Sequence, residues 1–401
     1  MCGIGAISSG NQSLLRPKEC LETINRVQNH RGPDSNRIWI SEDGKLGLSH
    51  TRLAIIDLSS SGIQPLHSHD GLYTVSFNGE IYNYKELRTQ LCSLGSSFYT
   101  DTDTEVILEA YRHWGYNMVQ RLNGMFAFAI YDHTREILFG ARDYLGKKPF
   151  LYAEINGSVV IASELPALLA IPGIDRSTSN EGIASMLLHN LRHIPEPYSA
   201  YRSIRKLRPG HCIIVRHGLI LKTWRYWEPK VSPTIYQPSD IRLLLEESIR
   251  LRLNSDVPIA AFLSGGIDST AIVSLMLKQG YSNLKTYAFG RNEDDEDVIR
   301  SQVVAHMLGT SHRVVYFDAD KCWDTFLRLL SVYGEPVMLL PLCHTFSICE
   351  QIRNDGIKVA MTGTGADEIF YGYNGHKRLY WLSKAISFLE FTKYISDSPL
   401  S

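Results

Sequence analysis

The residue with the clearest chemical potential is Cys2, which directly follows the initiator methionine. Removal of Met1 would make Cys2 the N-terminal residue and place its thiol beside its own α-amine. An α-amine has a pKa of about 8, which suits a general base that activates a thiol. Cys2 is therefore a candidate nucleophile, although its position alone favours a buried cysteine in a first strand.

Three later segments carry groups that an amide-cleaving thiol needs. Asn78-Gly79-Glu80 follows a predicted strand and can offer a side-chain amide and a backbone N–H to a tetrahedral oxyanion. Arg52 can hold the α-carboxylate of a free amino acid as a bidentate pair, and Asp103 can hold its α-ammonium group. Taken singly, Asn-Gly more often marks a turn, Arg52 a surface residue and Asp103 an acid at a helix start.

A fourth segment, Ser264-Gly265-Gly266-Ile267-Asp268-Ser269-Thr270, lies between a predicted strand and a predicted helix. Glycines let backbone N–H groups approach a phosphate, hydroxyls donate to its oxygens, and a helix N-terminus adds a favourable dipole. No Gly-Lys-Ser/Thr follows, so the segment is not a Walker loop. It predicts a phosphate-binding loop, with a glycine-rich strand-to-helix turn as the plain alternative.

The elements that position the first three segments are short strands and two helices. Thr102 is the expected N-cap of the second helix, with Glu105 three residues on. We expect strands at Ile38–Ile40, Leu53–Leu58, Tyr73–Phe77, Phe126–Tyr131, Ile137–Gly140 and Val159–Ala162, and helices at Asn83–Leu94 and Thr102–Trp114. This pattern predicts a layered α+β domain built around antiparallel sheets.

The second half has a different order of predicted strands and helices. Residues from about 195 to 238 contain six prolines and form the boundary between the two halves, where no long regular element is expected. Beyond it, helices are predicted at Asp240–Leu253, Thr270–Gln279 and Asp297–Leu308, and strands at Ile259–Leu263, Lys285–Phe289, His312–Phe317 and Ile357–Met361, with two further helices before the last strand. Strands that alternate with helices predict a parallel sheet that binds ligands at the carboxyl ends of its strands.

Composition narrows the class of protein. A chain of 401 residues predicts two domains, and 41 Lys+Arg against 42 Asp+Glu favours neither nucleic acid nor a membrane surface as a partner. No apolar run approaches the ~18 residues of a membrane span, and the N-terminus does not resemble a secretory signal. The seven cysteines are scattered without a C-x-x-C pair, which predicts neither a disulfide framework nor a zinc site and favours a reducing cytoplasm.

Taken together and in order, the motifs of the first half resemble those of the class II, N-terminal-nucleophile glutamine amidotransferases. The matching segments are Met1-Cys2-Gly3-Ile4, Arg31-Gly32-Pro33-Asp34, Arg52-Leu53, Phe77 to Tyr84, Asp103-Thr104-Glu105, Met125 to Phe128 and Arg142 to Gly146. The resemblance implies an αββα Ntn-hydrolase sandwich over residues 1–195. It also implies that Cys2 is the nucleophile and that Asn78 and Gly79 form the oxyanion hole. The implied glutamine-binding residues are Arg52, Leu53, Ala54, Ile55, Ile56, Asn78, Gly79, Glu80 and Asp103.

The second half resembles the N-type ATP pyrophosphatases, and the order of the two halves is similar to that of the asparagine synthetases. The resemblance implies a connecting segment over 196–235, an α/β ATP-binding domain over 236–401, and Mg²⁺ held by Asp268 and Asp367. The implied ATP-binding residues are Phe262, Leu263, Ser264, Gly265, Gly266, Asp268, Ser269, Thr270, Phe289, Thr362 and Gly363. The implied reaction joins glutamine, aspartate and ATP through aspartyl-AMP, with ammonia tunnelled from Cys2. A homodimer is compatible with it.

Two departures from the family pattern affect the acceptor. Thr364 stands where the family commonly has a carboxylate, and a hydroxyl is a poor base for the attacking ammonia. The sequence also ends at Ser401, well before the family's usual end, so a lysine that steadies the activated intermediate is expected to be missing. These features leave four alternatives open: a truncated domain, completion by a partner, another acceptor such as a sugar uronic acid or a biosynthetic intermediate, or a non-catalytic module that senses glutamine or nucleotide. The phosphate-loop segment argues against a sugar-phosphate amidotransferase, which would need an isomerase domain there.

Overall fold

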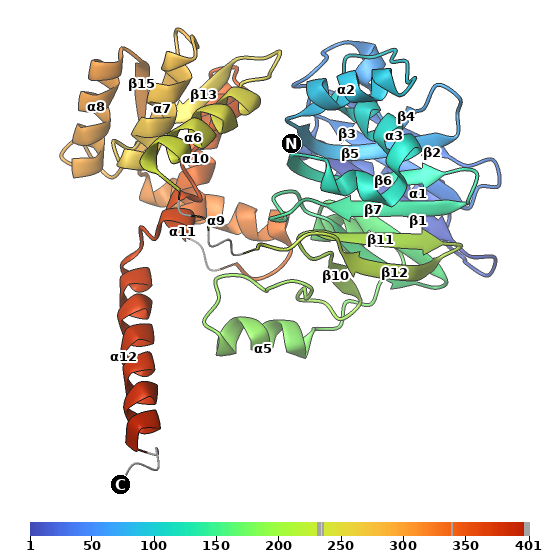
Figure 1. Cartoon of the computed structure of the whole chain (residues 1–401). Helices are drawn as coiled ribbons and strands as arrows, with labels where there is room; N and C mark the ends of the chain where they lie inside the picture. Colours follow the sequence, from blue (N-terminus) through green and yellow to red (C-terminus); the bar gives the residue numbers. More distant parts are fainter. Residues whose placement is uncertain (231–233, 235, 338–339, 397–401) are drawn as a thin grey trace. The chain divides into compact units, whose positions relative to one another are not determined.

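The computed structural model describes residues 1–230, 234, 236–337 and 340–396 (Figure 1). The chain forms two compact units. The first comprises residues 1–258 with 318–350, and the second comprises residues 259–317 with 351–401. These bounds differ from those of the predicted domains at 1–195, 196–235 and 236–401, whose limits stay predictions.

Two six-stranded antiparallel sheets form the centre of the first unit. One sheet has the order β10-β8-β9-β1-β3-β2 and the other has the order β12-β11-β7-β6-β5-β4. The strands of the first are β1 (Gly3–Ser9), β2 (Ser35–Ile40), β3 (Leu46–Arg52), β8 (Leu151–Ile155), β9 (Ser158–Ala162) and β10 (Ile204–Lys206). Those of the second are β4 (Leu66–His67), β5 (Tyr73–Ile81), β6 (Gly124–Asp132), β7 (Ile137–Arg142), β11 (His211–Arg216) and β12 (Leu219–Arg225).

The two sheets stack face to face with helices outside them. The core between the sheets includes Ile4, Leu48, Ala127 and Ile213, all fully buried. The helices α1 (Pro17–Val27) and α4 (Leu165–Leu169) cover the outer face of the first sheet, and α2 (Tyr84–Ser93) and α3 (Asp103–Trp114) that of the second. Figure 1 shows α2 and α3 side by side on this outer face. The predicted αββα layering is therefore confirmed.

Hydrogen bonds between buried polar groups tie the facing sheets together. Buried His50 on β3 lies with Nε2 3.0 Å from the carbonyl oxygen of Phe77 on β5. The Ser76 hydroxyl donates to the carbonyl oxygen of Ser49 at 2.7 Å. Burial lowers the pKa of His50 to about 3, so its imidazole is neutral at physiological pH. These contacts fix the position of β5 relative to β3. Asn78 lies on β5, and Arg52 lies at the end of β3.

The predicted elements of the first unit are confirmed with one exception. The segment Leu53–Leu58, predicted as a strand, is a loop that follows the end of β3 at Arg52. The chain turns here because the guanidinium of Arg52 binds the carbonyl oxygens of Asp57 and Ser59, with Asp57 at a φ of 51°. Strands β1, β3, β4, β8, β10, β11 and β12 and helices α1, α4 and α5 (Asn180–Leu188) were not predicted.

The second unit is built on a parallel sheet of order β15-β14-β13-β16, as predicted. Its elements are β13 (Ile259–Phe262), α7 (Ile267–Lys278), β14 (Lys285–Gly290), α8 (Glu296–Leu308), β15 (Ser311–Tyr316), β16 (Val359–Met361), α11 (Ala366–Phe370) and α12 (Asn374–Ser396). The helices α6 (Pro238–Arg252) and α9 (Ala319–Tyr333) belong to the first unit, and α10 (Leu340–Asn354) begins there. Among the described residues, no helix is long and apolar enough to cross a membrane.

A buried glutamine links β5 to the start of α3. The Gln64 side-chain oxygen accepts from the Phe77 N–H at 2.7 Å, and its amide donates to the Thr104 hydroxyl at 3.1 Å. We expect Gln64→Leu to lower the free energy of unfolding by about 1–3 kcal/mol, because it leaves a buried N–H without a partner. Denaturant unfolding checks this value. Gln90→Leu, at an exposed position of α2, is the matched control and should change it by less than about 0.5 kcal/mol.

Candidate active sites

Cys2 precedes β1 and is held from both sides. Its sulfur lies 3.4 Å from the backbone nitrogen of Leu53 and 3.7 Å from the Leu53 carbonyl oxygen. The Arg31 guanidinium donates to the Cys2 carbonyl oxygen at 2.9 Å and pairs with Glu164 at 2.8 Å. The predicted nucleophile is therefore seated against the predicted glutamine loop, which begins at Leu53.

The first residues of β1 are fixed by two polar side chains from other elements. The Gln28 amide donates to the Ile4 carbonyl oxygen at 3.1 Å, and its oxygen accepts from the Ser163 N–H at 2.8 Å. The Ser163 hydroxyl accepts in turn from the Ile4 N–H at 3.0 Å. Because β1 also pairs with β3 and β9, Cys2 emerges from a rigid strand. Neither Gln28 nor Ser163 was predicted to matter.

Asn78 and Gly79 lie on β5 in an environment that suits oxyanion binding. Asn78 is 1% exposed, and its buried Nδ2 has no hydrogen-bond partner among the described residues. A buried donor without a partner lowers the free energy of unfolding by about 1–3 kcal/mol, so an acceptor atom of a ligand would be bound favourably here. A Cβ on Gly79 would lie 2.1 Å from the Met125 carbonyl oxygen, so only glycine fits there. The role of the pair in an oxyanion hole stays a prediction.

Arg52, at the end of β3, is 7% exposed and is held by the loop that follows. Its guanidinium donates to the carbonyl oxygens of Ser59, at 2.8 Å, and Asp57. A guanidinium has five N–H donors, so these bonds orient it without using up its capacity to bind a carboxylate. The predicted glutamine-site residues Leu53, Ala54, Ile55 and Ile56 form the loop, and the Ala54 N–H donates to Asp34 at 2.8 Å.

Asp103 begins α3 and is buried beside β5. Its carboxylate accepts from the Ile81 N–H at 2.9 Å, and Thr102 caps the helix as predicted by accepting from the Glu105 N–H. Burial, followed by the charges of Glu80 and Cys2, raises the pKa of Asp103 to about 7. The pKa of Glu80 is also raised by burial and is drawn back by Lys148. The structure therefore brings Cys2, Glu80 and Asp103 close enough for their charges to interact.

The sequence analysis missed Lys148, which is 5% exposed beside these residues. Its ammonium lies 3.2 Å from the Met1 sulfur, and burial lowers its pKa despite the nearby charge of Glu80. The Asp143 carboxylate accepts from the Lys148 N–H at 2.9 Å, and Arg142 donates to the Lys148 carbonyl oxygen at 2.8 Å. The motif Arg142 to Gly146, which ends just before Lys148, was the signal that could have found it.

The same surroundings favour a neutral amine at the chain terminus. The pKa of the Met1 α-amine is lowered to about 5, first by burial, while the charges of Arg31 and Lys148 lower it and that of Cys2 raises it. An amine that is neutral at pH 7 can accept a proton from a thiol. The base that the sequence predicts is the α-amine of processed Cys2, which is a different group from the Met1 amine, so that role stays a prediction.

In the second unit, the predicted phosphate loop joins β13 to α7. Gly265 has a φ of 76°, and a Cβ there would lie 2.7 Å from the Ser301 nitrogen, so the turn requires glycine. The Ser269 hydroxyl accepts from the Ser264 N–H at 3.2 Å, and the buried Thr270 hydroxyl has no partner among the described residues. Asp268 and Ser269 lie in the first turn of α7, where the dipole favours an anion.

The second predicted nucleotide loop, which begins at Thr362, packs against the first. A Cβ on Gly363 would lie 3.1 Å from the Asp268 Cβ and 3.2 Å from the Ser269 nitrogen. The hydroxyls of Thr362 and Thr364 are 2.8 Å apart. Phe262, Leu263 and Phe289 lie at the carboxyl ends of the adjacent strands β13 and β14, the edge where parallel sheets bind ligands.

Asp268 and Asp367 offer the oxygen ligands that Mg²⁺ prefers. The Asp367 carbonyl oxygen accepts from the Gly372 N–H at 3.0 Å, which fixes the turn after α11. No cluster of three or more His, Cys, Asp or Glu side chains suited to a metal occurs in the described ranges.

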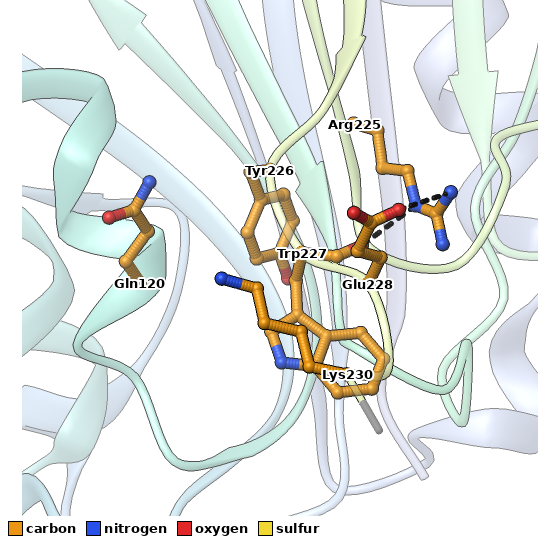
Figure 2. Close-up of a pocket in the computed structure, with 6 residues that line it drawn as sticks. All are labelled: Gln120, Arg225, Tyr226, Trp227, Glu228 and Lys230. Atoms are coloured by element: carbon orange, nitrogen blue, oxygen red, sulfur yellow. Dashed lines mark hydrogen bonds and ion pairs between the residues drawn. The ribbon is translucent and has the colours of Figure 1, made fainter. Parts of the chain in front are cut away.

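A separate open pocket of about 730 Å³ lies in the first unit and contains no predicted site residue. Figure 2 shows Gln120 facing a single stretch of chain that supplies Arg225, Tyr226, Trp227, Glu228 and Lys230. Arg225 and Glu228 form an ion pair at 2.9 Å. The Trp227 ring stacks on Tyr144 with a centroid distance of 5.0 Å. The stretch therefore packs on the Arg142-to-Gly146 motif.

The halves of the chain match two family models. Residues 1–227 match a glutamine amidotransferase domain, and residues 240–398 match asparagine synthase. The chain is 33% identical to putative asparagine synthetase [glutamine-hydrolyzing] 2 of Methanocaldococcus jannaschii, covering 95% of this chain and 77% of that one. It is 32% identical to asparagine synthetase [glutamine-hydrolyzing] 3 of Bacillus subtilis, covering 93% of this chain and 63% of that one.

A more distant likeness is to a solved structure of glutamine phosphoribosylpyrophosphate amidotransferase from B. subtilis. It has 15% identity and a TM-score of 0.44 and covers 90% of this chain and 91% of that one. The fold and the two matching models define a glutamine amidotransferase joined to an α/β domain consistent with ATP binding. The chain belongs to the asparagine synthetase, glutamine-hydrolysing, family.

The raised pKa of Asp103 predicts a pH dependence of glutamine binding. The α-ammonium group of glutamine should bind the ionised carboxylate, whose fraction grows as the pH rises through about 7. We expect the Kd of glutamine for a Cys2→Ala variant to fall roughly tenfold between pH 6 and pH 8. Isothermal titration calorimetry checks this, and the Cys2→Ala variant should not hydrolyse the glutamine during the measurement.

Asp103→Asn in the same background is the control for this effect. It should bind glutamine weakly, with a Kd that changes little over the same pH range. The role of Asp103 is wrong if the Asn variant binds as tightly as its parent and keeps the same pH dependence.

Proposed function

We propose that this protein catalyses the ATP-dependent amidation of aspartate to asparagine with glutamine as the nitrogen donor. The observation that carries the proposal is the buried side-chain amide of Asn78, which has no hydrogen-bond partner among the described residues. It lies on a strand beside Cys2, in a chain that belongs to this family. The chain spans only about 60% of the length of several relatives, so its activity and substrates are inferred.

In the proposed glutaminase reaction, Arg52 holds the α-carboxylate of glutamine, while Asp103 and Glu80 hold its α-ammonium. The neutral α-amine of processed Cys2 takes the thiol proton, and the thiolate attacks the side-chain amide. Asn78 and the Gly79 N–H bind the oxyanion that forms. The C–N bond then breaks, ammonia leaves with the proton from the amine, and water hydrolyses the thioester to glutamate.

In the proposed synthetase reaction, the aspartate side-chain carboxylate attacks the α-phosphorus of ATP. The bond to the β-phosphate oxygen breaks, and pyrophosphate and aspartyl-AMP form. Backbone N–H groups and hydroxyls of Ser264 to Thr270 bind the phosphates, and Phe262, Leu263 and Phe289 pack the adenine. Mg²⁺ at Asp268 and Asp367 would neutralise phosphate charge when bound. Ammonia from Cys2, carried through an internal channel, displaces AMP.

We also propose that the protein works in the reducing cytoplasm, and a homodimer is compatible with the proposal. All seven cysteines are free, and the scattered thiols suit a reducing compartment. The near-zero net charge gives no electrostatic attraction to nucleic acid or anionic lipid, so the proposed partners are glutamine, aspartate and ATP.

A second candidate is amidation of a different carboxylate, such as a sugar uronic acid or a biosynthetic intermediate. Thr364 favours it, because its hydroxyl bonds to Thr362 and is a weak base for the attacking ammonia. Relatives with other names exist: the chain is 31% identical to amidase chry2 of Gibberella zeae over 94% of its length, covering 60% of that protein. The acceptor is therefore the least constrained part of the proposal.

The two half-reactions should be separable by single substitutions. Cys2→Ala should abolish glutamine hydrolysis but leave ATP-to-pyrophosphate turnover with ammonia unchanged, because only the thiol is lost. Asp268→Ala should abolish pyrophosphate release but preserve glutamine hydrolysis, because a ligand of Mg²⁺ is lost. Glutamate and pyrophosphate assays on both variants make each one the control for the other. Full glutamine hydrolysis by the Cys2→Ala variant, or normal pyrophosphate release by the Asp268→Ala variant, would contradict the assignments.

The acceptor can be tested by following pyrophosphate release with glutamine, ATP, Mg²⁺ and a panel of acids. With aspartate, we expect amide formation to lag behind glutamine hydrolysis, because general base help is worth about 10²–10⁴-fold. Thr364→Glu should speed asparagine formation, whereas Thr364→Ser, the matched control, should not. If another acid is amidated faster than aspartate by the unaltered protein, the second candidate replaces the first.

A further inference from the structure

A glutamate that follows β9 bonds to the side chain that holds Cys2. The Glu164 carboxylate accepts from Arg31 Nη1 at 2.8 Å, and Nε of the same guanidinium donates to the Cys2 carbonyl oxygen at 2.9 Å. The side chains of Arg31 and Glu164 are each 9% exposed. All three residues lie in the first compact unit. A buried carboxylate is thus connected to the backbone of the proposed nucleophile through one guanidinium.

Glu164 stands at the N-cap position of α4, but it does not cap this helix. An N-cap side chain commonly accepts a hydrogen bond from the first N–H groups of its helix. The Glu164 side chain makes no such bond, and Pro166 in the first turn has no N–H to offer. The carboxylate is directed instead at Arg31 and at His30, whose Nε2 lies 3.0 Å away. The needs of α4 therefore do not explain where this side chain points.

Ser163, the residue before Glu164, holds the next part of the same backbone. Its hydroxyl accepts from the Ile4 N–H at 3.0 Å, and its own N–H donates to the Gln28 side-chain oxygen at 2.8 Å. Gln28 and Arg31 belong to the single turn that follows α1. Two neighbouring residues after β9 and two residues of this turn therefore fix the backbone where β1 begins.

The buried ion pair of Arg31 and Glu164 is not arranged for the greatest stability. A single hydrogen bond joins the two groups, and Arg31 Nη2 and Glu164 Oε2 are buried without a partner among the described residues. Burial alone would raise the pKa of Glu164, but the contacts with His30 and Arg31 hold it below its usual value, so the carboxylate is charged at neutral pH. Because desolvation of such a pair opposes folding, its place beside Cys2 indicates a role in the site.

The contacts of Glu164 are separate from those of the groups proposed to bind glutamine. Arg52 is held by the carbonyl oxygens of Asp57 and Ser59, and Asp103 accepts from the Ile81 N–H. These bonds join β3, β5 and α3, whereas Glu164 bonds to the turn after α1. Loss of the Glu164 carboxylate should therefore displace the thiol without weakening the binding of glutamine.

We infer that Glu164 is a positioning residue that acts through Arg31 to hold the backbone of Cys2, and with it the thiol, in place for attack on the glutamine amide. The inference rests on the proposed glutaminase reaction. A buried guanidinium that loses its carboxylate is an uncompensated charge, and it gains free energy by turning toward water. The Cys2 carbonyl oxygen then loses its donor, and the thiol no longer keeps the distance and angle that attack requires.

The test measures the KM and kcat of glutamine hydrolysis from the release of glutamate. Glu164→Ala should lower kcat about 10- to 100-fold, the order of effect of a misplaced reacting group, and change KM by less than about twofold. Glu164→Gln keeps an acceptor oxygen for Arg31 and should lower kcat only about 3- to 10-fold. Thermal unfolding establishes that each variant is folded, and Glu164→Gln, which preserves the side-chain volume, decides the question if Glu164→Ala does not fold.

A second set of variants tests whether Glu164 acts through Arg31. Arg31→Met should itself lower kcat, and adding Glu164→Gln to it should lower kcat by less than about a further twofold, because residues that act along one path are not additive. Glu19→Ala is the matched control. It removes an exposed arginine–glutamate pair, between Arg16 and Glu19, from the start of α1 and should leave KM and kcat unchanged.

Three results would overturn the inference. They are a kcat of the folded Glu164 variants within twofold of that of the unaltered protein, a raised KM in place of a lowered kcat, and an equal loss from Glu164→Gln with and without Arg31→Met. Failure of the proposed function would look different, because the unaltered protein would then not hydrolyse glutamine.

Discussion

A nucleophile at a chain terminus is tethered on one side only, so everything that orients it must come from the residues that follow and from the elements they pack against. In this protein Cys2, the proposed nucleophile, directly precedes β1, which lies between β3 and β9. Gln28 and Ser163 fix the first backbone groups of that strand, and Arg31 binds the Cys2 carbonyl oxygen. The two stacked sheets make strand β1 rigid, because polar contacts such as the one between His50 and the Phe77 carbonyl oxygen join them.

The proposed glutamine site contains buried polar groups whose surroundings favour a ligand over water. The Asn78 amide lacks a partner among the described residues, Asp103 is partly protonated near neutral pH, and Lys148 is buried with a lowered pKa. Each of these features costs folding free energy in the empty protein. A glutamine molecule would provide an oxyanion to Asn78 and an ammonium to Asp103. In the proposed reaction, the unfavourable features would thus become interactions that bind the substrate and its transition state.

Prediction from the sequence succeeded best where the chain builds its parallel sheet. Apolar strands alternate there with helices, and a glycine such as Gly309, at a φ of 68°, ends α8. Prediction was weakest in the first unit. Strand β3 was not predicted because its His50 and Thr51 are polar yet buried, His50 against the facing sheet and Thr51 against Gln28. Leu53–Leu58 has a strand-like sequence but must bend to enclose Arg52. Lys148 became visible only through tertiary burial, since a lysine in a loop is ordinarily exposed.

The central claim is that nitrogen released from glutamine at Cys2 is delivered to an ATP-activated carboxylate by the same protein. The most direct measurement supplies glutamine labelled with ¹⁵N in its side-chain amide, together with ATP, Mg²⁺, aspartate and an excess of unlabelled ammonium, and determines the isotope in the asparagine formed by mass spectrometry. The account predicts labelled asparagine well above the share expected from free ammonium. Glutamate that accumulates while any asparagine carries only the unlabelled nitrogen would contradict it.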